Sequence, residues 1–234
     1  AFPQFFSHGL NTLGISCLLV GVSLVLVFLF LKHENRTFSE IGFSWDYEAR
    51  VQLLLGTFAG IVVVGFMIFV MTKISAVSIE PVANPNIWDA IGYAAIIFLV
   101  LALMEEIVFR SYPLFILAEG VGVRASIYVT SIFFAFYHGF DPTNLLGPGV
   151  WGLFFGFAAV WTKGLALPLG FHFGLNWMQS LFGLKLQYAS SLWTLVQGDK
   201  GAILTTDVVG LLFQLILLII GLTLIEIFVR KRTV

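Results

Sequence analysis

Long apolar stretches separated by short polar connections set the pattern of this chain. A hydrocarbon core about 30 Å thick is crossed by a helix of about 20 predominantly apolar residues. Seven stretches approach or exceed that length, at residues 10–31, 51–72, 88–109, 124–138, 148–162, 165–182 and 208–229. The pattern therefore predicts an all-α, polytopic transmembrane helical bundle of about seven spans, with residues 1–234 as a single membrane domain.

The connections between these stretches contain residues that break helices. Residues 111–118 are also apolar, but Pro113 interrupts them, so they predict either a short re-entrant helix or part of an eighth span. Pro81 and Pro85 predict a loop at 79–86, and the Gly- and Pro-rich segment 139–149 predicts a turn. The longest expected loop is 184–207, with an exposed turn at 198–201.

The first apolar stretch is predicted to be a retained transmembrane helix. A signal peptide has basic residues before its apolar run and a small-residue cleavage site after it. Here the basic residues Lys32 and Arg36 follow the run, and no such cleavage site is evident.

Composition agrees with a membrane location. Hydrophobic residues make up 59% of the chain and charged residues only 11%, whereas soluble domains have about a quarter charged residues. The lipid bilayer is therefore the first expected partner. No basic patch suggests nucleic acid, and the single Cys17 rules out a disulfide within the chain.

The basic residues predict the orientation of the bundle. With the N-terminus outside, one set of loops and ends holds only Lys73, Lys185 and Lys200. The opposite set holds eight basic residues: Lys32, Arg36, Arg50, Arg124, Lys163, Arg230, Lys231 and Arg232. Because basic residues collect on the cytoplasmic side, this distribution predicts a cytoplasmic C-terminus, in a membrane of the bacterial plasma-membrane type.

Three pairs of glycines are spaced four residues apart within the predicted spans. Such spacing places both members on one helix face and lets two helices approach closely in lipid. The pairs are Gly56/Gly60, Gly152/Gly156 and Gly170/Gly174.

The charged residues Glu105, Glu106 and Arg110 end a long apolar run. Charges at such a depth cost free energy unless they are paired or functional. Glu106 and Arg110 are four apart in the order that favours a helical ion pair, whereas Glu105 points about 100° away from Glu106 and needs another partner. The alternative is that all three are solvated at the membrane interface.

Two further polar groups lie on later spans. His138 follows Phe134 by four residues, and His172 precedes Asn176 by four. Taken singly, they fit an interfacial histidine and an interhelical hydrogen bond. Together with Glu105 they are the parts of a hydrolase, in which Glu105 and His138 hold and deprotonate a water. His172 and Asn176 then donate hydrogen bonds to the oxyanion of a tetrahedral intermediate.

In this order the motifs Glu-Glu-x-x-x-Arg, Phe-x-x-x-His and His-x-x-x-Asn resemble those of the CPBP family. This family comprises the CAAX-protease and bacteriocin-processing membrane proteins, also called the Abi family. The resemblance covers residues 101–176, and all three motifs match without substitution. It implies an intramembrane endopeptidase in which Glu105, His138, His172 and Asn176 are catalytic, with Glu105 chosen because it is the first motif position. Glu106 and Arg110 have a supporting role.

Cofactor use is a separate question. Two histidines and a carboxylate can hold zinc, and members of the family are often labelled metalloproteases. The chain has no His-Glu-x-x-His helix, and the glutamate-dependent mechanism inferred for the family's prenyl-protein endoproteases requires no metal. The prediction is therefore no cofactor, with zinc as the alternative.

The expected partner besides lipid is a peptide or membrane-protein substrate. A prenylated C-terminus, a bacteriocin-type leader, a signalling peptide and a membrane-protein segment all remain open as substrates. A second hypothesis is a non-catalytic membrane partner that retains the fold, as an immunity protein, a scaffold or a subunit of a larger complex with other membrane proteins. A third, a small transporter with Glu105 as a proton relay, is disfavoured because the chain has no two similar halves.

Overall fold

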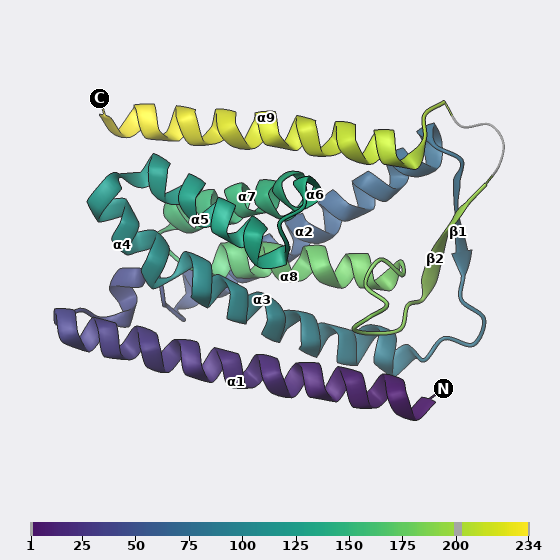
Figure 1. Ribbon diagram of the computed structural model, residues 1–234, viewed down its shortest axis with the longest axis horizontal. Helices are drawn as coiled ribbons and strands as arrows, with labels where there is room; N and C mark the ends of the chain where they lie inside the picture. The colour runs from purple at the N-terminus through teal and green to yellow at the C-terminus, as the bar shows by residue number, and fades with distance from the viewer. Residues whose placement is uncertain (1, 199–202, 234) are drawn as a thin grey trace.

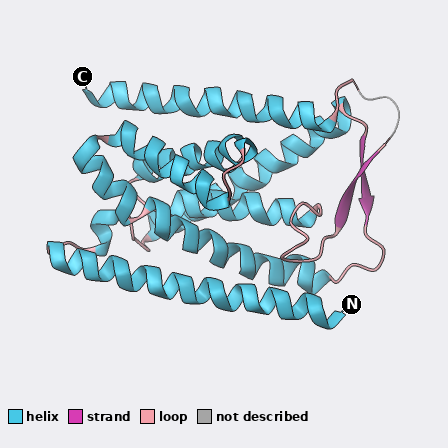
Figure 2. Ribbon diagram, in the orientation of Figure 1, coloured by secondary structure: helices cyan, strands magenta, loops and turns pink. Residues whose placement is uncertain are grey.

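Each apolar stretch forms a helix in the computed structural model, which describes residues 2–198 and 203–233 (Figures 1 and 2). The predicted all-α transmembrane bundle is thereby confirmed. The helices are α1 (Phe2–Glu34), α2 (Tyr47–Ile74), α3 (Ala94–Arg110), α4 (Tyr112–Val121), α5 (Val123–His138), α6 (Pro142–Leu146), α7 (Pro148–Thr162), α8 (Ala166–Leu181) and α9 (Thr206–Thr233). A 3-10 turn forms at Phe38–Ile41, and a π-helical turn at Trp88–Tyr93 leads into α3.

The helices differ in how far they can reach through a bilayer. Among the described residues, five helical segments are long and apolar enough to cross it: Asn11–Glu34, Tyr47–Ile74, Trp88–Val121, Pro142–Thr162 and Thr206–Lys231. The chain is an integral membrane protein. Helices α5 and α8 have 16 residues each, which at 1.5 Å per residue is about 24 Å, less than the roughly 30 Å core. The additional apolar residues 111–118 form the start of α4, and the single residue Ser111 separates this helix from α3.

Helices α1 and α9 lie at opposite edges of the bundle, and the shorter helices lie between them (Figure 1). Helix α8 packs against α2, α3 and α7. Helix α5 stops after His138 because Gly139 adopts a φ of 136°, which a residue with a side chain rarely adopts. The turn that follows, with α6, lies near the middle of the molecule rather than at its end (Figure 1). Helix α5 therefore ends about midway along the bundle.

Glycines set the closest helix contact, between α2 and α8. A Cβ atom at Gly60 would lie 2.4 Å from the Phe171 carbonyl oxygen, and one at Gly174 would lie 2.2 Å from the Thr57 carbonyl oxygen. Gly56 and Gly170 face the opposite helix in the same way. The two backbones are thus in direct contact, as the spacing of these glycines predicts.

The third glycine pair lies on α7 and faces α5. A Cβ atom at Gly152 would lie 3.1 Å from the Ser131 Cα atom, and one at Gly156 would lie 3.2 Å from Ile127 Cγ2. The predicted close approach is therefore present at all three pairs.

Three predictions about the connections were partly wrong. The segments 79–86 and 184–207 are not entirely loops, because they contain residues of strands β1 (Val77–Pro81) and β2 (Trp193–Gln197), which pair antiparallel. The segment 139–149 is not only a turn, because it contains the short helix α6. The register places Val77 opposite Gln197 and Pro81 opposite Trp193. The strands are brought together from distant parts of the chain, so neither shows a local hairpin signal. The predicted turn at 198–201 lies, apart from Gly198, outside the described residues.

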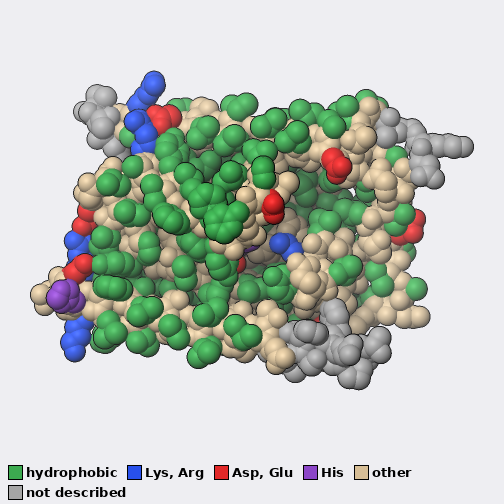
Figure 3. Space-filling view, viewed as in Figure 1, with side chains coloured by type: hydrophobic (Ala, Val, Ile, Leu, Met, Phe, Trp, Pro, Cys, Tyr) green, Lys and Arg blue, Asp and Glu red, His purple; other side chains and the backbone are tan. Residues whose placement is uncertain are grey.

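Basic side chains collect at one end of the molecule. On the face drawn in Figure 3, most Lys and Arg side chains lie at the end where the C-terminus is, and hydrophobic side chains cover much of the length between the ends. This distribution agrees with the uneven count of basic residues in the sequence.

The α2–α8 contact leads to a stability prediction. Replacing Gly60 with Ala inserts a methyl group against the backbone of α8, so we expect the free energy of unfolding to fall by about 1–3 kcal/mol. Thermal unfolding in detergent micelles measures this. Gly65→Ala is the matched control, since a Cβ there meets only Met178 Cε at 3.8 Å. Equal stability of the two variants would contradict the proposed contact.

Candidate active site

Helix α3 carries two carboxylates that point in different directions. Residues one apart on an α-helix differ by about 100°, whereas residues four apart share a face. Glu106 therefore lies beside Arg110, with 3.6 Å between Glu106 Oε1 and Arg110 Nη1, and both side chains are fully buried. The ion pair predicted from the spacing is present. Glu105 points elsewhere, toward the histidines.

Helix α8 presents its histidine on the side opposite its glycines. Because Gly170 and Gly174 face α2, residues two positions further on point about 200° away, toward α3. His172 accordingly lies between the two carboxylates of α3. Its Nδ1 atom is 2.8 Å from Glu106 Oε1 and its Nε2 atom is 3.4 Å from Glu105 Oε2.

Helix α5 brings the second histidine to the same carboxylate. His138 Nδ1 is 2.9 Å from the Phe134 carbonyl oxygen, one helical turn earlier. Its Nε2 atom is 4.0 Å from Glu105 Oε2, beyond direct hydrogen-bonding distance. The His138 side chain is 32% exposed, against 6% for His172. His138 is therefore the more accessible of the two rings.

The hydrogen bonds indicate which nitrogen of each ring carries a proton. A carbonyl oxygen only accepts, so His138 must donate from Nδ1, and in the neutral ring Nε2 keeps its lone pair. Glu106, held beside a guanidinium, likewise accepts from Nδ1 of His172. The Nε2 atom of His172 can then donate a hydrogen bond only if the ring is an imidazolium.

Arg110 is fully buried and surrounded by aromatic rings. Its guanidinium carbon lies 4.0 Å from the ring centroid of Phe134, 5.3 Å from that of Phe155 and 5.5 Å from that of Phe109. Its three nitrogens have no hydrogen-bond partner among the described residues. Cation–π contacts and the ion pair with Glu106 thus offset the cost of burying this charge.

Phe134 packs at the centre of this arrangement. It makes edge-to-face contacts with His138 and His172, at centroid distances of 4.6 and 5.9 Å. Phe155 stacks on His172 at 4.4 Å with the ring planes 15° apart. These rings fix both imidazoles in position.

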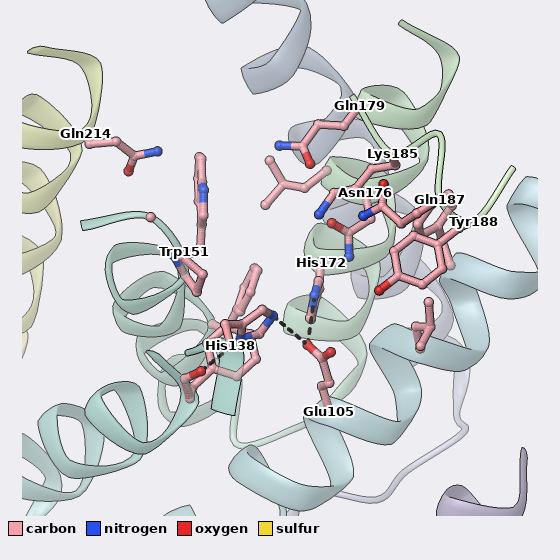
Figure 4. A pocket seen from close by; sticks show the side chains of 17 residues that line it. Glu105, His138, Trp151, His172, Asn176, Gln179, Lys185, Gln187, Tyr188 and Gln214 are labelled. Carbon is pink, nitrogen blue, oxygen red and sulfur yellow. Dashed lines mark hydrogen bonds and ion pairs between the residues drawn. The ribbon is translucent and has the colours of Figure 1, made fainter. Parts of the chain in front are cut away.

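The four residues predicted to be catalytic line one cavity of about 380 Å³ (Figure 4). They are Glu105, His138, His172 and Asn176. Glu106 and Arg110 are not among the residues that line it; they lie behind His172. The structure thus brings together all six predicted site residues, four at the cavity surface and two beneath it.

A comparison with family models matches the part of the chain that carries these residues. Residues 87–178 match the model described as type II CAAX prenyl endopeptidase Rce1-like. This confirms the resemblance to the CPBP family. The match covers α3 to α7 and most of α8 and includes all six predicted residues. The searches among curated proteins and among solved structures gave no match.

The cavity contains the donor types that zinc accepts, the imidazole nitrogens of His138 and His172 and the carboxylate of Glu105. As placed, however, no group of three or more His, Cys, Asp or Glu side chains within residues 2–198 and 203–233 is arranged to hold a metal ion. Metal-free chemistry stays the prediction, with zinc as the alternative.

Several cavity residues lie outside the sequence motifs. Gln179, Lys185, Gln187 and Tyr188 line one wall together with Asn176, and Trp151 and Gln214 lie on another side (Figure 4). Gln214 comes from α9, outside residues 87–178, which match the family model. Its position, a single amide within an apolar span, is a signal that the sequence offers. Lys185, Gln187 and Tyr188 lie in a loop, where no periodic pattern in the sequence indicates which side chains face the cavity. Their placement depends on tertiary contacts.

The buried pair leads to a second stability prediction. Arg110→Met leaves the Glu106 carboxylate buried without its guanidinium, so we expect a loss of about 3 kcal/mol in the free energy of unfolding. The double variant Glu106→Gln/Arg110→Met contains no unpaired buried charge and should recover part of this loss. Thermal unfolding of the wild type, of the single variants Arg110→Met and Glu106→Gln, and of the double variant measures the coupling. If the double variant loses the sum of the two single effects, the pair does not act as a unit.

Proposed function

We propose that this protein is an intramembrane endopeptidase that hydrolyses a peptide bond with a water activated by Glu105 and His138. The observation that carries the proposal is the convergence of Glu105, His138, His172 and Asn176 on one cavity within the bundle. The match to an endopeptidase family over residues 87–178 supports it.

The nucleophile is a water held between Glu105 and His138. The 4.0 Å separation of Glu105 Oε2 and His138 Nε2 is too long for a direct hydrogen bond and suits a shared water. Glu105 Oε2 has no hydrogen-bond partner among the described residues, which leaves it free to accept one. Glu105 takes a proton from the water, the resulting hydroxide attacks the peptide carbonyl carbon, and the carbonyl oxygen becomes an oxyanion.

His172 and Asn176 stabilise that oxyanion. They are one helical turn apart on α8 and line the same cavity, so both can donate to one oxygen. When the tetrahedral intermediate collapses, the carbon–nitrogen bond breaks. Glu105 then passes its proton to the departing amine, which leaves a carboxyl group and an amine as products.

This role requires His172 to be an imidazolium, because its Nδ1 already donates to Glu106. The buried charges then balance. Two carboxylates, Glu105 and Glu106, are matched by the guanidinium of Arg110 and the imidazolium of His172. A neutral cluster is the arrangement that a low-dielectric interior favours.

The substrate is a peptide or a membrane-protein segment, bound in or near the bilayer. The matching family description names a CAAX prenyl endopeptidase, so a prenylated C-terminal peptide is the first substrate to test. A bacteriocin-type leader, a signalling peptide and a membrane-protein segment are the next.

We further propose a bacterial-type plasma membrane location, with the C-terminus in the cytoplasm. The eight-to-three distribution of basic residues supports this orientation. The loop that carries Lys185 then lies on the outer side. A C-terminal fusion to green fluorescent protein should fluoresce and one to alkaline phosphatase should be inactive; the reverse pattern would overturn the assignment.

Activity is tested with the purified full chain in lipid nanodiscs and fluorogenic prenylated peptides. Glu105→Gln should lower kcat at least about 10²-fold, since it removes the general base. Asn176→Ala should lower kcat about 10²- to 10³-fold while KM changes little, since it removes an oxyanion donor. The control is Glu80→Gln, at an exposed position of β1 away from the cavity. Cleavage that survives Glu105→Gln would refute the assigned base.

The same assay separates metal-free from zinc chemistry. We expect the rate to be unchanged by 1,10-phenanthroline, and the purified protein to contain no stoichiometric zinc. Loss of activity that added zinc restores would establish the alternative. Absence of cleavage of every peptide class, with a cellular phenotype that survives Glu105→Gln, would instead indicate a non-catalytic membrane partner.

A further inference from the structure

Gln214 is the only residue of α9, among those that the structure describes, that lines the cavity with Glu105. Its amide projects toward the cavity from the side opposite Lys185 and Tyr188 (Figure 4). Gln214 Oε1 is buried and has no hydrogen-bond partner among the described residues. Because a buried acceptor without a donor is unfavourable, this amide favours a bound molecule that brings an N–H or O–H group.

The packing of α9 fixes the direction of the Gln214 side chain. Residues 214, 218, 221 and 225 recur every three or four positions, so they share one face of the helix. That face is turned into the bundle: Gly221 is buried, Ile225 is fully buried, and Leu218 packs against the same apolar cluster as Ile225. Gln214 therefore points inward, although it is polar.

Polar contacts also hold α9 to α5. Glu226 Oε2 lies 2.8 Å from Arg124 Nη2, and the Tyr128 hydroxyl donates to Glu226 Oε1 at 3.0 Å. Both partners belong to α5, the helix that ends with His138. The protein itself thus sets the position of Gln214 relative to the site, with no contribution from a substrate.

A peptide in the cavity needs hydrogen-bond partners for its backbone, since an unpaired N–H group costs free energy in a water-poor interior. Asn176 and Gln179 supply amides on the α8 side (Figure 4). Near α9, apart from His138, the polar side chains of the cavity are Gln214 and Trp151. An indole N–H only donates, so Gln214 Oε1 is the acceptor that α9 offers to a peptide N–H.

We propose that Gln214 Oε1 accepts a hydrogen bond from one backbone N–H of the substrate and so holds the peptide against α9. This inference rests on the proposed function, because it assigns a substrate contact to the same cavity. Gln214 is then a substrate-binding residue, and its contact is the same in the ground state and the transition state. A proline, which has no N–H, is disfavoured at the substrate position that Gln214 contacts.

The contact is tested by binding, separately from cleavage. The probe is a fluorescein-labelled farnesylated heptapeptide ending in Cys-Val-Ile-Met. It is made with all backbone amides, and again as a series in which one amide at a time is replaced by an ester, which has no N–H. Fluorescence anisotropy is measured with the Glu105→Gln protein in phosphatidylcholine nanodiscs, so that the probe is not consumed.

We expect one ester of the series to bind about three- to tenfold more weakly than the all-amide probe, as for the loss of one hydrogen bond between neutral groups. Adding Gln214→Met should weaken binding of the all-amide probe by a similar factor and remove the penalty of that one ester. Thr223→Val is the matched control, because it removes a hydroxyl from an exposed position of α9 outside the cavity. It should leave every affinity unchanged. If no ester penalty changes with Gln214→Met, the inference is overturned.

Thermal unfolding of the same variants tests for a structural role. The Gln214 acceptor has no partner within the described part of the chain, so Gln214→Met should leave the melting temperature unchanged or raise it. A lower melting temperature would show that the amide stabilises the fold, and would overturn the inference.

Cleavage of the all-amide probe by the protein with Glu105 intact reports on the proposed function. Coupling between Gln214 and one ester without any cleavage supports the contact and refutes the peptidase. Cleavage without this coupling supports the peptidase and refutes the contact. Where both are present, Gln214→Met should raise KM about three- to tenfold and leave kcat nearly unchanged. A fall in kcat with an unchanged KM would place Gln214 in the reaction itself and overturn the inference.

Discussion

The need to neutralise charge inside an apolar bundle governs this structure. Glu106 and Arg110 are fully buried and pair with each other at 3.6 Å. The Glu106 Oε1 atom that faces Arg110 also lies 2.8 Å from Nδ1 of His172, which directs the other ring nitrogen toward Glu105. A pair that looks purely structural thus sets the orientation of a cavity residue. Removing either partner would disturb both stability and the position of the imidazole.

A second constraint comes from the glycines of α2 and α8. They bring the two backbones into contact and so fix the rotation of α8 about its axis. Because His172 lies two residues after Gly170, this rotation directs it away from α2 and toward α3. Helix α5 ends early, after His138, about midway along the bundle (Figure 1), and His138 there lines the same cavity as His172. Packing and turn geometry therefore bring together residues that are distant in sequence.

The sequence predicts those features whose cause is local. The helices follow from apolar runs, the ion pair from i, i+4 spacing, and the close helix contacts from paired glycines. It does not predict the strands β1 and β2, which are over 100 residues apart and have no local turn between them. Nor does it predict the aromatic rings around Arg110, since Phe155 comes from a separate helix. The place of Lys185 in the cavity also depends on distant contacts, such as that between Asp89 and the loop backbone.

The most direct test of the account is terminal proteomics of membranes that contain this protein. Wild type, Glu105→Gln and the Glu80→Gln control are compared at matched expression, and new peptide termini are quantified. The account predicts a set of termini present with wild type and Glu80→Gln and absent with Glu105→Gln. Termini that persist with Glu105→Gln, or a phenotype that persists with no change in any terminus, would contradict it.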